Sequence, residues 1–372
     1  MMKVAFFIGS LNRGGTEMLV LDTFRKNDGT AFEPVLVYRN EGELSDAYRE
    51  TGVPMFCINP TRNKIGYLRK MRRLLRDEGV DILHTQTHLN AFIGVFCTCF
   101  TSVKLVSTFH GFTPTFIDKV FAQFALWFTD ASIFVSKYVC VWYLKRTFFV
   151  SQERCHVVYN GIDFSRFNKY YPIPDFLEKI APISLRIVKM VMVGNFSSVR
   201  SQFFLCHALK AIKDRGTCDF KFFFVGKKSN AEPEIFDNCV NYCKESGLLN
   251  TSVFFVGGRS DVPAILQHVD AFVYSTNRDT FGIAVIEAVA SGLPAIVNDW
   301  GVMKEVTENG KFAVLYKTLD VNDCADKMEE MIVNIEKRKE TASFNAEVVR
   351  QRFSIDNHIR NLRDLYRRVL ER

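Results

Sequence analysis

Short apolar runs alternate with amphipathic stretches along the whole of this 372-residue chain, and the alternation runs twice. Apolar strands bounded by helices are typical of parallel sheets covered on both faces. We expect strands at residues 4–8, 34–38, 82–84, 105–108, 131–135 and 156–159, and then at 189–193, 221–225, 253–256, 271–274 and 294–297. Helical spacing is clearest over residues 67–76 and 203–213. The sequence therefore predicts an α/β fold with two Rossmann-like, doubly wound domains.

The segment Asn168–Asp175, rich in proline and aromatic residues, separates the two runs and predicts a linker. We expect an N-terminal domain over residues 1–170 and a C-terminal domain over residues 171–352. Residues 353–372 should form a helix, with Ser354 as its N-cap, that packs back towards the N-terminal domain. Ligands bind beyond the carboxyl ends of the strands in such sheets, so we expect the two domains to face each other across a cleft.

The composition, with 48% hydrophobic and 24% charged residues, indicates a globular chain. The apolar run Ala91–Val103 has 13 residues, fewer than a membrane-spanning helix needs. The ten cysteines never form a Cys-x-x-Cys pair, which disfavours zinc and dithiol redox sites and favours reduced thiols in the cytoplasm. The apolar stretch at residues 4–9 is too short for a signal peptide.

The net charge of +7 is concentrated in residues 1–170, which carry 21 basic and 15 acidic residues. This asymmetry favours an anionic partner, such as a lipid or a phosphorylated ligand. The excess is too small to indicate nucleic-acid binding, and no nucleic-acid motif accompanies it. We therefore expect no nucleic-acid partner.

Three segments could carry chemistry. Gly14 and Gly15 follow the first expected strand and precede a helix, where backbone amides can approach an anion; a tight turn alone is the alternative. The Gly-x-Gly spacing of dinucleotide sites is absent, so a nicotinamide cofactor is not supported. Arg200 begins the first helix of the second run and could hold a phosphate, or it could be a solvated surface arginine.

The third segment is the most specific. Asp279 lies just before a helix that is expected to begin near Gly282, and Glu287 lies within that helix among apolar residues. A carboxylate in such surroundings is costly unless it is partnered, and the hydroxyls of a ribose would be suitable partners.

Taken in order, a set of short motifs carries a family resemblance. The motifs are Gly14–Glu17, Asp81–Thr85, Thr108–Gly111, Val135–Ser136, Asn160–Asp163, Val193–Gly194, Phe255–Gly257 and the acidic pair Asp279 and Glu287. The chain resembles retaining glycosyltransferases of the GT-B fold, in the large family of bacterial polysaccharide and lipid glycosyltransferases related to glycogen synthase. The resemblance implies that the N-terminal domain binds the acceptor and the C-terminal domain the nucleotide sugar.

The resemblance also implies roles for individual residues. Glu287 would bond the ribose of the donor, Asp279 the hydroxyls of the transferred sugar, and Arg200 the diphosphate. The implied donor-binding residues are Gly15, Gly194, Asn195, Arg200, Arg259, Ser275, Asp279, Thr280, Phe281, Gly282, Ile283 and Glu287. The implied acceptor-binding residues are Gly14, Thr16, His110 and Phe112, and the implied catalytic residues are His110, Asp279 and Arg200. Such a site acts by neutralising the departing diphosphate and orienting an acceptor hydroxyl.

Four positions depart from the usual pattern of the family. Asp279 stands in place of the commoner glutamate, Arg200 in place of lysine, and Asn195 where many relatives have arginine. Gly301–Glu305 lacks the second glycine of the usual Gly-Gly-x-Pro-Glu motif. We therefore keep two alternatives: an inactive partner subunit that binds nucleotide sugars, and a nucleotide-sugar epimerase or phosphorylase of the same fold.

The leading hypothesis is the transfer of a sugar from a nucleotide diphosphate, most simply UDP, to a glycan or lipid-linked acceptor. The resemblance places such a reaction in cell-surface polysaccharide biosynthesis, for example of capsule or O-antigen. No metal and no other cofactor is expected. His84 and His88 have no third ligand nearby in the sequence, so a structural or cleft-lining role is favoured for both.

Residues 62–76 raise the question of membrane contact. They contain seven cations and no acid: Arg62, Lys64, Arg69, Lys70, Arg72, Arg73 and Arg76. The segment could be an interfacial helix on anionic lipid, or an ordinary helix with an apolar stripe on the sheet and a basic outer face. The aromatic-rich segment Phe112–Phe128 supports membrane contact and could equally line an acceptor cleft. We expect a cytoplasmic protein, with peripheral binding to the cytoplasmic face of the membrane as a hypothesis.

Overall fold

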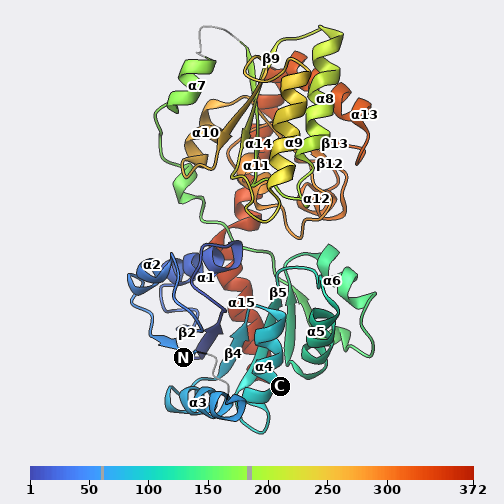
Figure 1. Cartoon of the computed structure of the whole chain (residues 1–372). Coiled ribbons are helices and arrows are strands. Elements are labelled where there is room, and N and C mark those ends of the chain that lie inside the picture. Colours follow the sequence, from blue (N-terminus) through green and yellow to red (C-terminus); the bar gives the residue numbers. More distant parts are fainter. Residues whose placement is uncertain (60–62, 182–186) are drawn as a thin grey trace. The chain divides into compact units, whose positions relative to one another are not determined.

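The computed structural model describes residues 1–59, 63–181 and 187–372, and these divide into two compact units (Figure 1). Unit 1 comprises Met1–Asp163 and Phe353–Arg372, and unit 2 comprises Phe164–Arg352. The division after Asp163 precedes the expected linker Asn168–Asp175, which lies within unit 2. The C-terminal segment returns to unit 1.

Unit 1 contains a seven-stranded parallel sheet in the order β3-β2-β1-β4-β5-β6-β7. Its strands are β1 (Lys3–Phe7), β2 (Glu33–Tyr38), β3 (Met55–Cys57), β4 (Ile82–Thr85), β5 (Lys104–Phe109), β6 (Ala131–Phe134) and β7 (Cys155–Val157). Its helices are α1 (Gly15–Lys26), α2 (Ser45–Arg49), α3 (Lys64–Asp77), α4 (His88–Thr98), α5 (Phe116–Phe128), α6 (Lys137–Leu144), the short η1 (Gln152–Arg154) and α15 (Ile355–Leu370).

Helices cover both faces of this sheet, because the chain leaves β1 in one direction and β4 in the other. On one face, α1 packs against α15. Ser354 caps α15 as expected, accepting a hydrogen bond from the N–H of Asn357. On the other face, α4 packs between α3 and α5. The buried residues Tyr67, Met71 and Leu75 place one stripe of α3 in the core on this face.

Unit 2 contains a six-stranded parallel sheet in the order β10-β9-β8-β11-β12-β13. Its strands are β8 (Val188–Val193), β9 (Phe220–Val225), β10 (Val253–Gly257), β11 (Ala271–Tyr274), β12 (Ala295–Asn298) and β13 (Val314–Tyr316). Its helices are η2 (Phe164–Phe167), α7 (Asp175–Ile180), α8 (Gln202–Arg215), α9 (Pro233–Glu245), α10 (Val262–His268), α11 (Ile283–Ala290), α12 (Gly301–Val306), α13 (Val321–Val333) and α14 (Ile335–Phe353), the last residue of which belongs to unit 1. Helix α8 packs against both α9 and α13.

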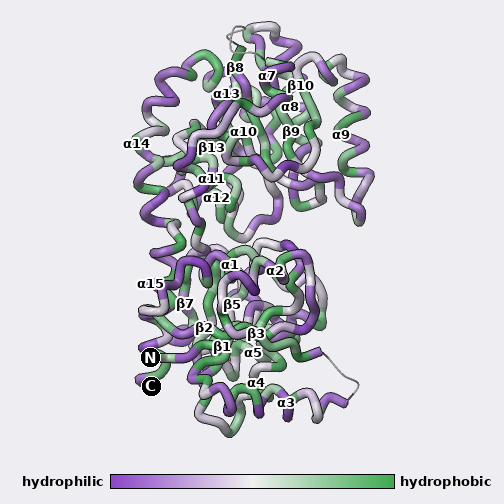
Figure 2. Tube along the Cα trace, turned by 90° about the vertical axis from the view of Figure 1, so that its left-hand side faces the viewer, coloured by the Kyte–Doolittle hydropathy of each residue, from purple (hydrophilic) through white to green (hydrophobic). Residues whose placement is uncertain are grey.

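The predicted α/β fold with two doubly wound sheets is confirmed. Each predicted strand overlaps a strand of the structure, whereas β3 and β13 were not expected. Both are edge strands of their sheets and have only three residues, fewer than a typical strand. Figure 2 shows that the strands are mainly hydrophobic, while α14 alternates between hydrophilic and hydrophobic residues. Across the described part of the chain, no helix has the length and hydropathy needed to cross a bilayer.

Candidate active site

The sheet of unit 2 reverses its direction of winding between its central strands β8 and β11. From β8 the chain continues to β9 on one side, and from β11 it continues to β12 on the other. Open α/β sheets bind ligands at this point, outside the carboxyl ends of the strands. Arg200 follows β8 and Asp279 follows β11, so the fold brings two of the predicted site residues to this point.

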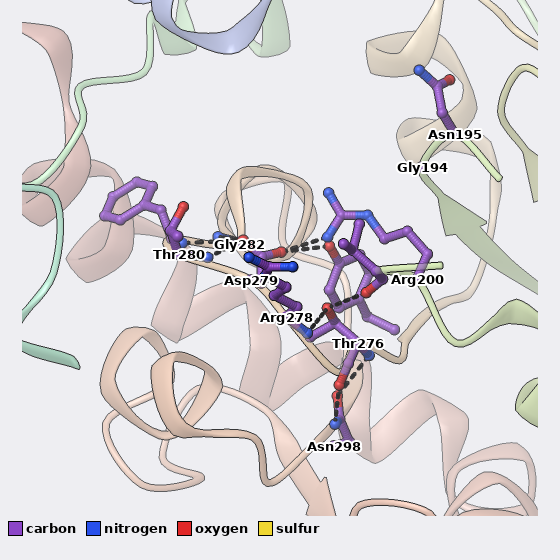
Figure 3. A network of polar contacts seen from close by, with 12 residues as sticks. Gly194, Asn195, Arg200, Thr276, Arg278, Asp279, Thr280, Gly282 and Asn298 are labelled. Atoms are coloured by element: carbon purple, nitrogen blue, oxygen red, sulfur yellow. Dashed lines mark hydrogen bonds and ion pairs between the residues drawn. The ribbon is translucent and has the colours of Figure 1, made fainter. Parts of the chain in front are cut away.

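The loops after β8 and β11 are joined by backbone hydrogen bonds. Arg200 and Thr276 form an isolated antiparallel bridge, and Ser201 N–H donates to the carbonyl of Ser275. Asn298, at the end of β12, bonds both the N–H and the carbonyl of Thr276, at 3.1 and 2.7 Å (Figure 3). The loop that carries Asp279 is therefore fixed relative to the loop that carries Arg200, and Ser275 is buried in this junction.

The side chains of Arg200 and Asp279 form an ion pair (Figure 3). Nη1 of Arg200 donates to Oδ2 of Asp279 at 2.6 Å, and the hydroxyl of Tyr274 donates to the same oxygen at 2.7 Å. The Arg200 guanidinium also lies 5.1 Å from the centre of the Tyr274 ring. The pair and its tyrosine thus form one network, of which Tyr274 was not predicted from the sequence.

The other carboxylate oxygen of Asp279 closes the loop that precedes α11. Oδ1 accepts the backbone N–H groups of Thr280, Phe281 and Gly282 at 2.7, 3.1 and 3.1 Å. All three are among the implied donor-binding residues, and in this structure their backbone amides bond Asp279. Helix α11 then begins at Ile283, close to the start expected from the sequence.

Gly282 is the N-cap of α11 and has a φ of +79°, in the left-handed region that favours glycine. A Cβ atom at this position would lie 2.6 Å from the Cε atom of Met303. The backbone conformation therefore favours glycine here, and a Cβ would also require the end of the Met303 side chain to shift.

The charges of the network reinforce one another. Burial opposes ionisation of Asp279, but the charge of Arg200 and the hydrogen bonds from Tyr274 and the backbone hold the pKa of its carboxyl below its usual range. Burial and the neighbouring carboxylate raise the pKa of Tyr274 well above its usual value. Burial opposes the charge of Arg200, but Tyr274 and Asp279 raise its pKa. The site thus presents an ionised carboxylate, a neutral tyrosine and a permanent cation.

Glu287, the second acid of the predicted pair, is buried in α11 with 9% of its surface exposed. It forms an ion pair with Arg166 of η2, which also packs on the ring of Phe167. Arg166 was missed in the sequence, where a single basic residue in an irregular segment carries no distinctive signal. It is the charged partner that the buried position of Glu287 calls for.

Gly194 and Asn195 hold the loop after β8 in place. The N–H of Gly194 donates to the carbonyl of Val225, and Oδ1 of Asn195 accepts the N–H of Lys227 at 3.0 Å. A Cβ at Gly226 would lie only 2.0 Å from the Gly194 carbonyl oxygen, so these two loops touch closely. In this structure the Asn195 side chain therefore joins the loop after β8 to the loop after β9.

Arg259 follows β10, which is an edge strand of the sheet. Its guanidinium makes two hydrogen bonds to Asp261, at 2.7 and 2.6 Å, and lies over the ring of Phe176. Arg259 is thus engaged with a neighbouring carboxylate, and two strands, β9 and β8, separate β10 from β11.

In unit 1, the predicted acceptor residues follow the carboxyl ends of strands near the reversal point between β1 and β4. Gly14 is the N-cap of α1, which Gly15 and Thr16 begin. A Cβ at Gly15 would meet no atom within 4 Å, so this residue faces open space. Phe112 packs on Trp142, with ring centres 4.9 Å apart.

His110 directly follows β5, and its Nε2 lies 2.8 Å from Oε1 of Gln86, which follows β4. Burial, together with the neighbouring His358 and His88, lowers the pKa of His110 to about 3. The imidazole is therefore neutral at physiological pH and can exchange hydrogen bonds without carrying charge.

The two histidines considered for metal binding have other partners. His84 is buried between the hydroxyls of Thr108 and Tyr366, at 2.7 and 2.6 Å, and His88 bonds the hydroxyl of Tyr143. Within residues 1–59, 63–181 and 187–372, no group of three or more His, Cys, Asp or Glu side chains is placed to hold a metal ion.

Comparison with known proteins identifies the family. The family model "Glycosyltransferase Family 4" matches residues 13–166, and "Glycosyl transferases group 1" matches residues 188–334. The chain is 24% identical over 304 residues to the Escherichia coli UDP-Gal:alpha-D-GlcNAc-diphosphoundecaprenol alpha-1,3-galactosyltransferase, covering 77% of this chain and 76% of the relative. It is 21% identical to the Staphylococcus aureus capsular polysaccharide biosynthesis glycosyltransferase CapH, covering 98% and 99% of the two chains.

Among solved structures, Anabaena HepE in complex with UDP and glucose matches with a TM-score of 0.83 and 18% identity, covering 98% of this chain and 99% of HepE. This likeness agrees with the two parallel sheets described above. The two family models together span most of both units. The chain therefore belongs to the glycosyltransferases of the GT-B fold, and it is a hexosyltransferase.

Proposed function

We propose that this enzyme transfers a hexose from a UDP-sugar, with retention of anomeric configuration, to a lipid-linked or growing glycan in cell-surface polysaccharide assembly. The observation that carries the proposal is the Arg200–Asp279 pair at the β8/β11 reversal point, with Glu287 in the second turn of α11. The relatives named for UDP-galactose transfer and capsule biosynthesis, and the likeness to HepE bound to UDP and glucose, support it.

Glu287 would receive the ribose hydroxyls of the donor. A carboxylate offers about four lone-pair directions, so it can accept two hydroxyls from a vicinal diol. In this structure Arg166 occupies one of its oxygens. The ribose must therefore displace Arg166 or share the carboxylate with it.

Arg200 would hold the diphosphate. Its guanidinium has five N–H donors, and the contact with Asp279 uses Nη1. The remaining donors can bond phosphate oxygens while the ion pair persists. Because arginine keeps its proton, Arg200 would stabilise the departing diphosphate as a fixed charge rather than as an acid.

The main role of Asp279 would be to orient the guanidinium of Arg200 towards the diphosphate. Five donors already bond its two oxygens, namely three backbone amides, the Tyr274 hydroxyl and Arg200. A hydroxyl of the transferred sugar would have to replace one of them. We propose that the sugar hydroxyl replaces one of the backbone amides before α11. These amides are neutral donors and bind a carboxylate less strongly than the charged guanidinium of Arg200 does.

The reaction breaks the bond between the anomeric carbon and the diphosphate oxygen and forms a bond from that carbon to the acceptor oxygen. The acceptor proton leaves with the diphosphate or passes to water. Retention rests on the resemblance to retaining enzymes of this fold. The neutral imidazole of His110 is proposed to bond a hydroxyl of the reacting sugar.

The test is UDP release and product formation over a panel of UDP-sugars. Arg200→Gln and Glu287→Gln should each lower turnover by about a hundredfold, whereas the surface controls Arg215→Gln and Glu234→Gln should leave it unchanged. NMR of the product reports the anomeric configuration. Donor binding without release would support the inactive-subunit alternative, and isomerisation of the donor without an acceptor would support an epimerase.

We also propose peripheral binding to the cytoplasmic face of an anionic membrane through unit 1. The apolar stripe of α3 is buried in the core, and its cations Lys64, Arg69 and Lys70 are exposed. Arg62 lies outside the described residues. On α5 of the same unit, Phe116 and Ile117 have 78% and 62% of their surface exposed.

Exposed cations together with exposed aromatic and aliphatic side chains match an anionic lipid surface. We expect the protein to sediment with vesicles containing phosphatidylglycerol at low salt. Lys70→Glu combined with Phe116→Ser should lower this binding, whereas Lys213→Glu in unit 2 should not. Equal recovery in the supernatant with and without such vesicles would refute the proposal.

A further inference from the structure

A cavity of about 480 Å³ lies within unit 1, in the size range of small-molecule pockets. Its apolar lining comes from α3, α4 and α5, and includes Tyr67, Leu89, Phe92, Phe96 and Phe121. The Phe92 ring lies 4.6 Å from that of Phe121 and 5.1 Å from that of Phe96, measured between centres. The lining is thus a cluster of aromatic rings, suited to a hydrocarbon chain.

Two cations border this apolar cavity, Arg39 directly after β2 and Lys64 in the first turn of α3. The Nε atom of Arg39 is buried and has no hydrogen-bond partner among the described residues. A buried guanidinium N–H without a partner is costly, and an anion would remove that cost.

Tyr67 supplies a second unmatched donor. Only 6% of its surface is exposed, it lines the cavity, and its hydroxyl finds no partner in the described part of the chain. The cavity thus combines an apolar aromatic lining with two unsatisfied donors and a second cation. This combination fits an amphiphile with an anionic, oxygen-rich head and a hydrocarbon tail.

The position of Arg39 indicates where the anionic head would lie. A Cβ on Gly9 would come within 3.1 Å of Nη2 of Arg39, so the guanidinium lies against the segment that follows β1. That segment continues into Gly14 and Thr16, the predicted acceptor-binding residues. Because Arg39 lines the cavity and directly follows β2, the cavity extends from the three helices α3, α4 and α5 to the carboxyl edge of the sheet.

We propose that this cavity binds the lipid phosphate carrier of the acceptor, with its phosphate at Arg39 and Lys64 and the first part of its hydrocarbon chain on the aromatic lining. This inference rests on the proposed transfer to a lipid-linked acceptor, and it assigns the part of unit 1 that recognises the lipid. Leu89 and Phe96, which have 37% and 38% of their surface exposed, mark the side on which a longer chain leaves the cavity.

The test is calorimetric titration of the full chain with decyl phosphate below its micelle-forming concentration, with decanol and inorganic phosphate as separate probes. Decyl phosphate should bind at least about tenfold more tightly than either, because only it uses both the cations and the aromatic lining. Equal affinity for decyl phosphate and decanol, or for decyl phosphate and inorganic phosphate, would overturn the proposal.

Matched variants locate the binding. Leu89→Trp fills the cavity from a partly exposed position and should abolish binding, whereas Val120→Trp, on the exposed side of α5, should not. Arg39→Gln should weaken decyl phosphate by about tenfold or more, and Arg69→Gln should have no effect. If the control variants lose as much affinity as the cavity variants, binding is a general surface effect and the assignment is wrong.

Two further measurements separate this inference from the proposed function. UDP affinity should be unchanged in all four variants, which confirms that unit 2 is intact. With a lipid-linked acceptor, Leu89→Trp should raise KM for the acceptor by about tenfold and leave kcat within twofold. If the unmodified protein showed no transfer activity but bound decyl phosphate as described, the proposed function would be refuted, whereas the assignment of the lipid phosphate site would still hold.

Discussion

The carboxylate of Asp279 bonds the guanidinium of Arg200 at 2.6 Å, although the two residues lie 79 positions apart in the chain. The same carboxylate also accepts three backbone amides that precede α11. One side chain therefore fixes both the cation expected to face the diphosphate and the loop expected to face the sugar.

Asp279→Asn removes the charge that opposes Arg200 and keeps the size of the side chain. We expect turnover to fall by about a hundredfold, because Arg200 loses the partner that aims it. Tyr274→Phe removes only one hydrogen bond to the same oxygen and should cost about tenfold or less. Steady-state UDP release measures both effects. A larger loss in Tyr274→Phe than in Asp279→Asn would contradict the proposed order of importance.

Gly282→Ala should destabilise unit 2. The left-handed φ of +79° penalises a Cβ by about 1–2 kcal/mol in the free energy of unfolding, and the end of the Met303 side chain must also shift. Gly15→Ala is the matched control for folding, since its Cβ would face open space. Urea unfolding should show no loss for Gly15→Ala. Its UDP-sugar affinity should nevertheless fall if Gly15 approaches the donor phosphate.

Arg166→Gln tests the displacement step at Glu287. If the ribose must displace Arg166 or share the carboxylate with it, removing this competitor should tighten UDP binding by about threefold, or about 0.7 kcal/mol. Calorimetric titration with UDP measures the change, with Arg215→Gln as the control. Markedly weaker UDP binding in Arg166→Gln would show instead that Arg166 contacts the nucleotide.

His358 predicts a pH dependence of the stability of unit 1. Burial lowers its pKa to about 4, although a hydrogen bond between its Nδ1 and the Tyr159 carbonyl opposes this shift. The unfolded chain takes up this proton near pH 6.5 and the folded chain only near 4, so stability is full above the higher value and falls between the two. The loss is up to about 1.4 kcal/mol per pH unit for one histidine.

The variant His358→Asn keeps a hydrogen-bond donor for the Tyr159 carbonyl and cannot titrate in this range. Its free energy of unfolding, measured by urea titration at several pH values, should depend less steeply on pH between about 4 and 6.5 than that of the unmodified protein. Parallel curves for the two proteins would exclude a contribution from His358.

The layers of the fold could be predicted from the amino-acid sequence alone. Apolar strands separated by helical stretches specify parallel sheets, because a strand buried on both faces must be apolar at nearly every position. The starts of α11 and α15 could also be predicted, because each depends on a single residue. Gly282 adopts a left-handed φ before α11, and Ser354 caps α15 with its side chain. The edge strands β3 and β13 were not predicted, although both lie in short apolar stretches, because three paired residues are fewer than a typical strand.

The contacts between distant side chains, by contrast, could be found only in the folded chain. Arg166 and Glu287 are 121 residues apart, and no local pattern relates them. Tyr274 joins the Arg200–Asp279 pair because β8 and β11 are neighbours in the sheet although they are not consecutive in the chain. The same holds for the cavity beside Arg39, which α3, α4 and α5 enclose together. Local propensity is set by near neighbours, whereas ion pairs and cavities depend on how distant segments pack.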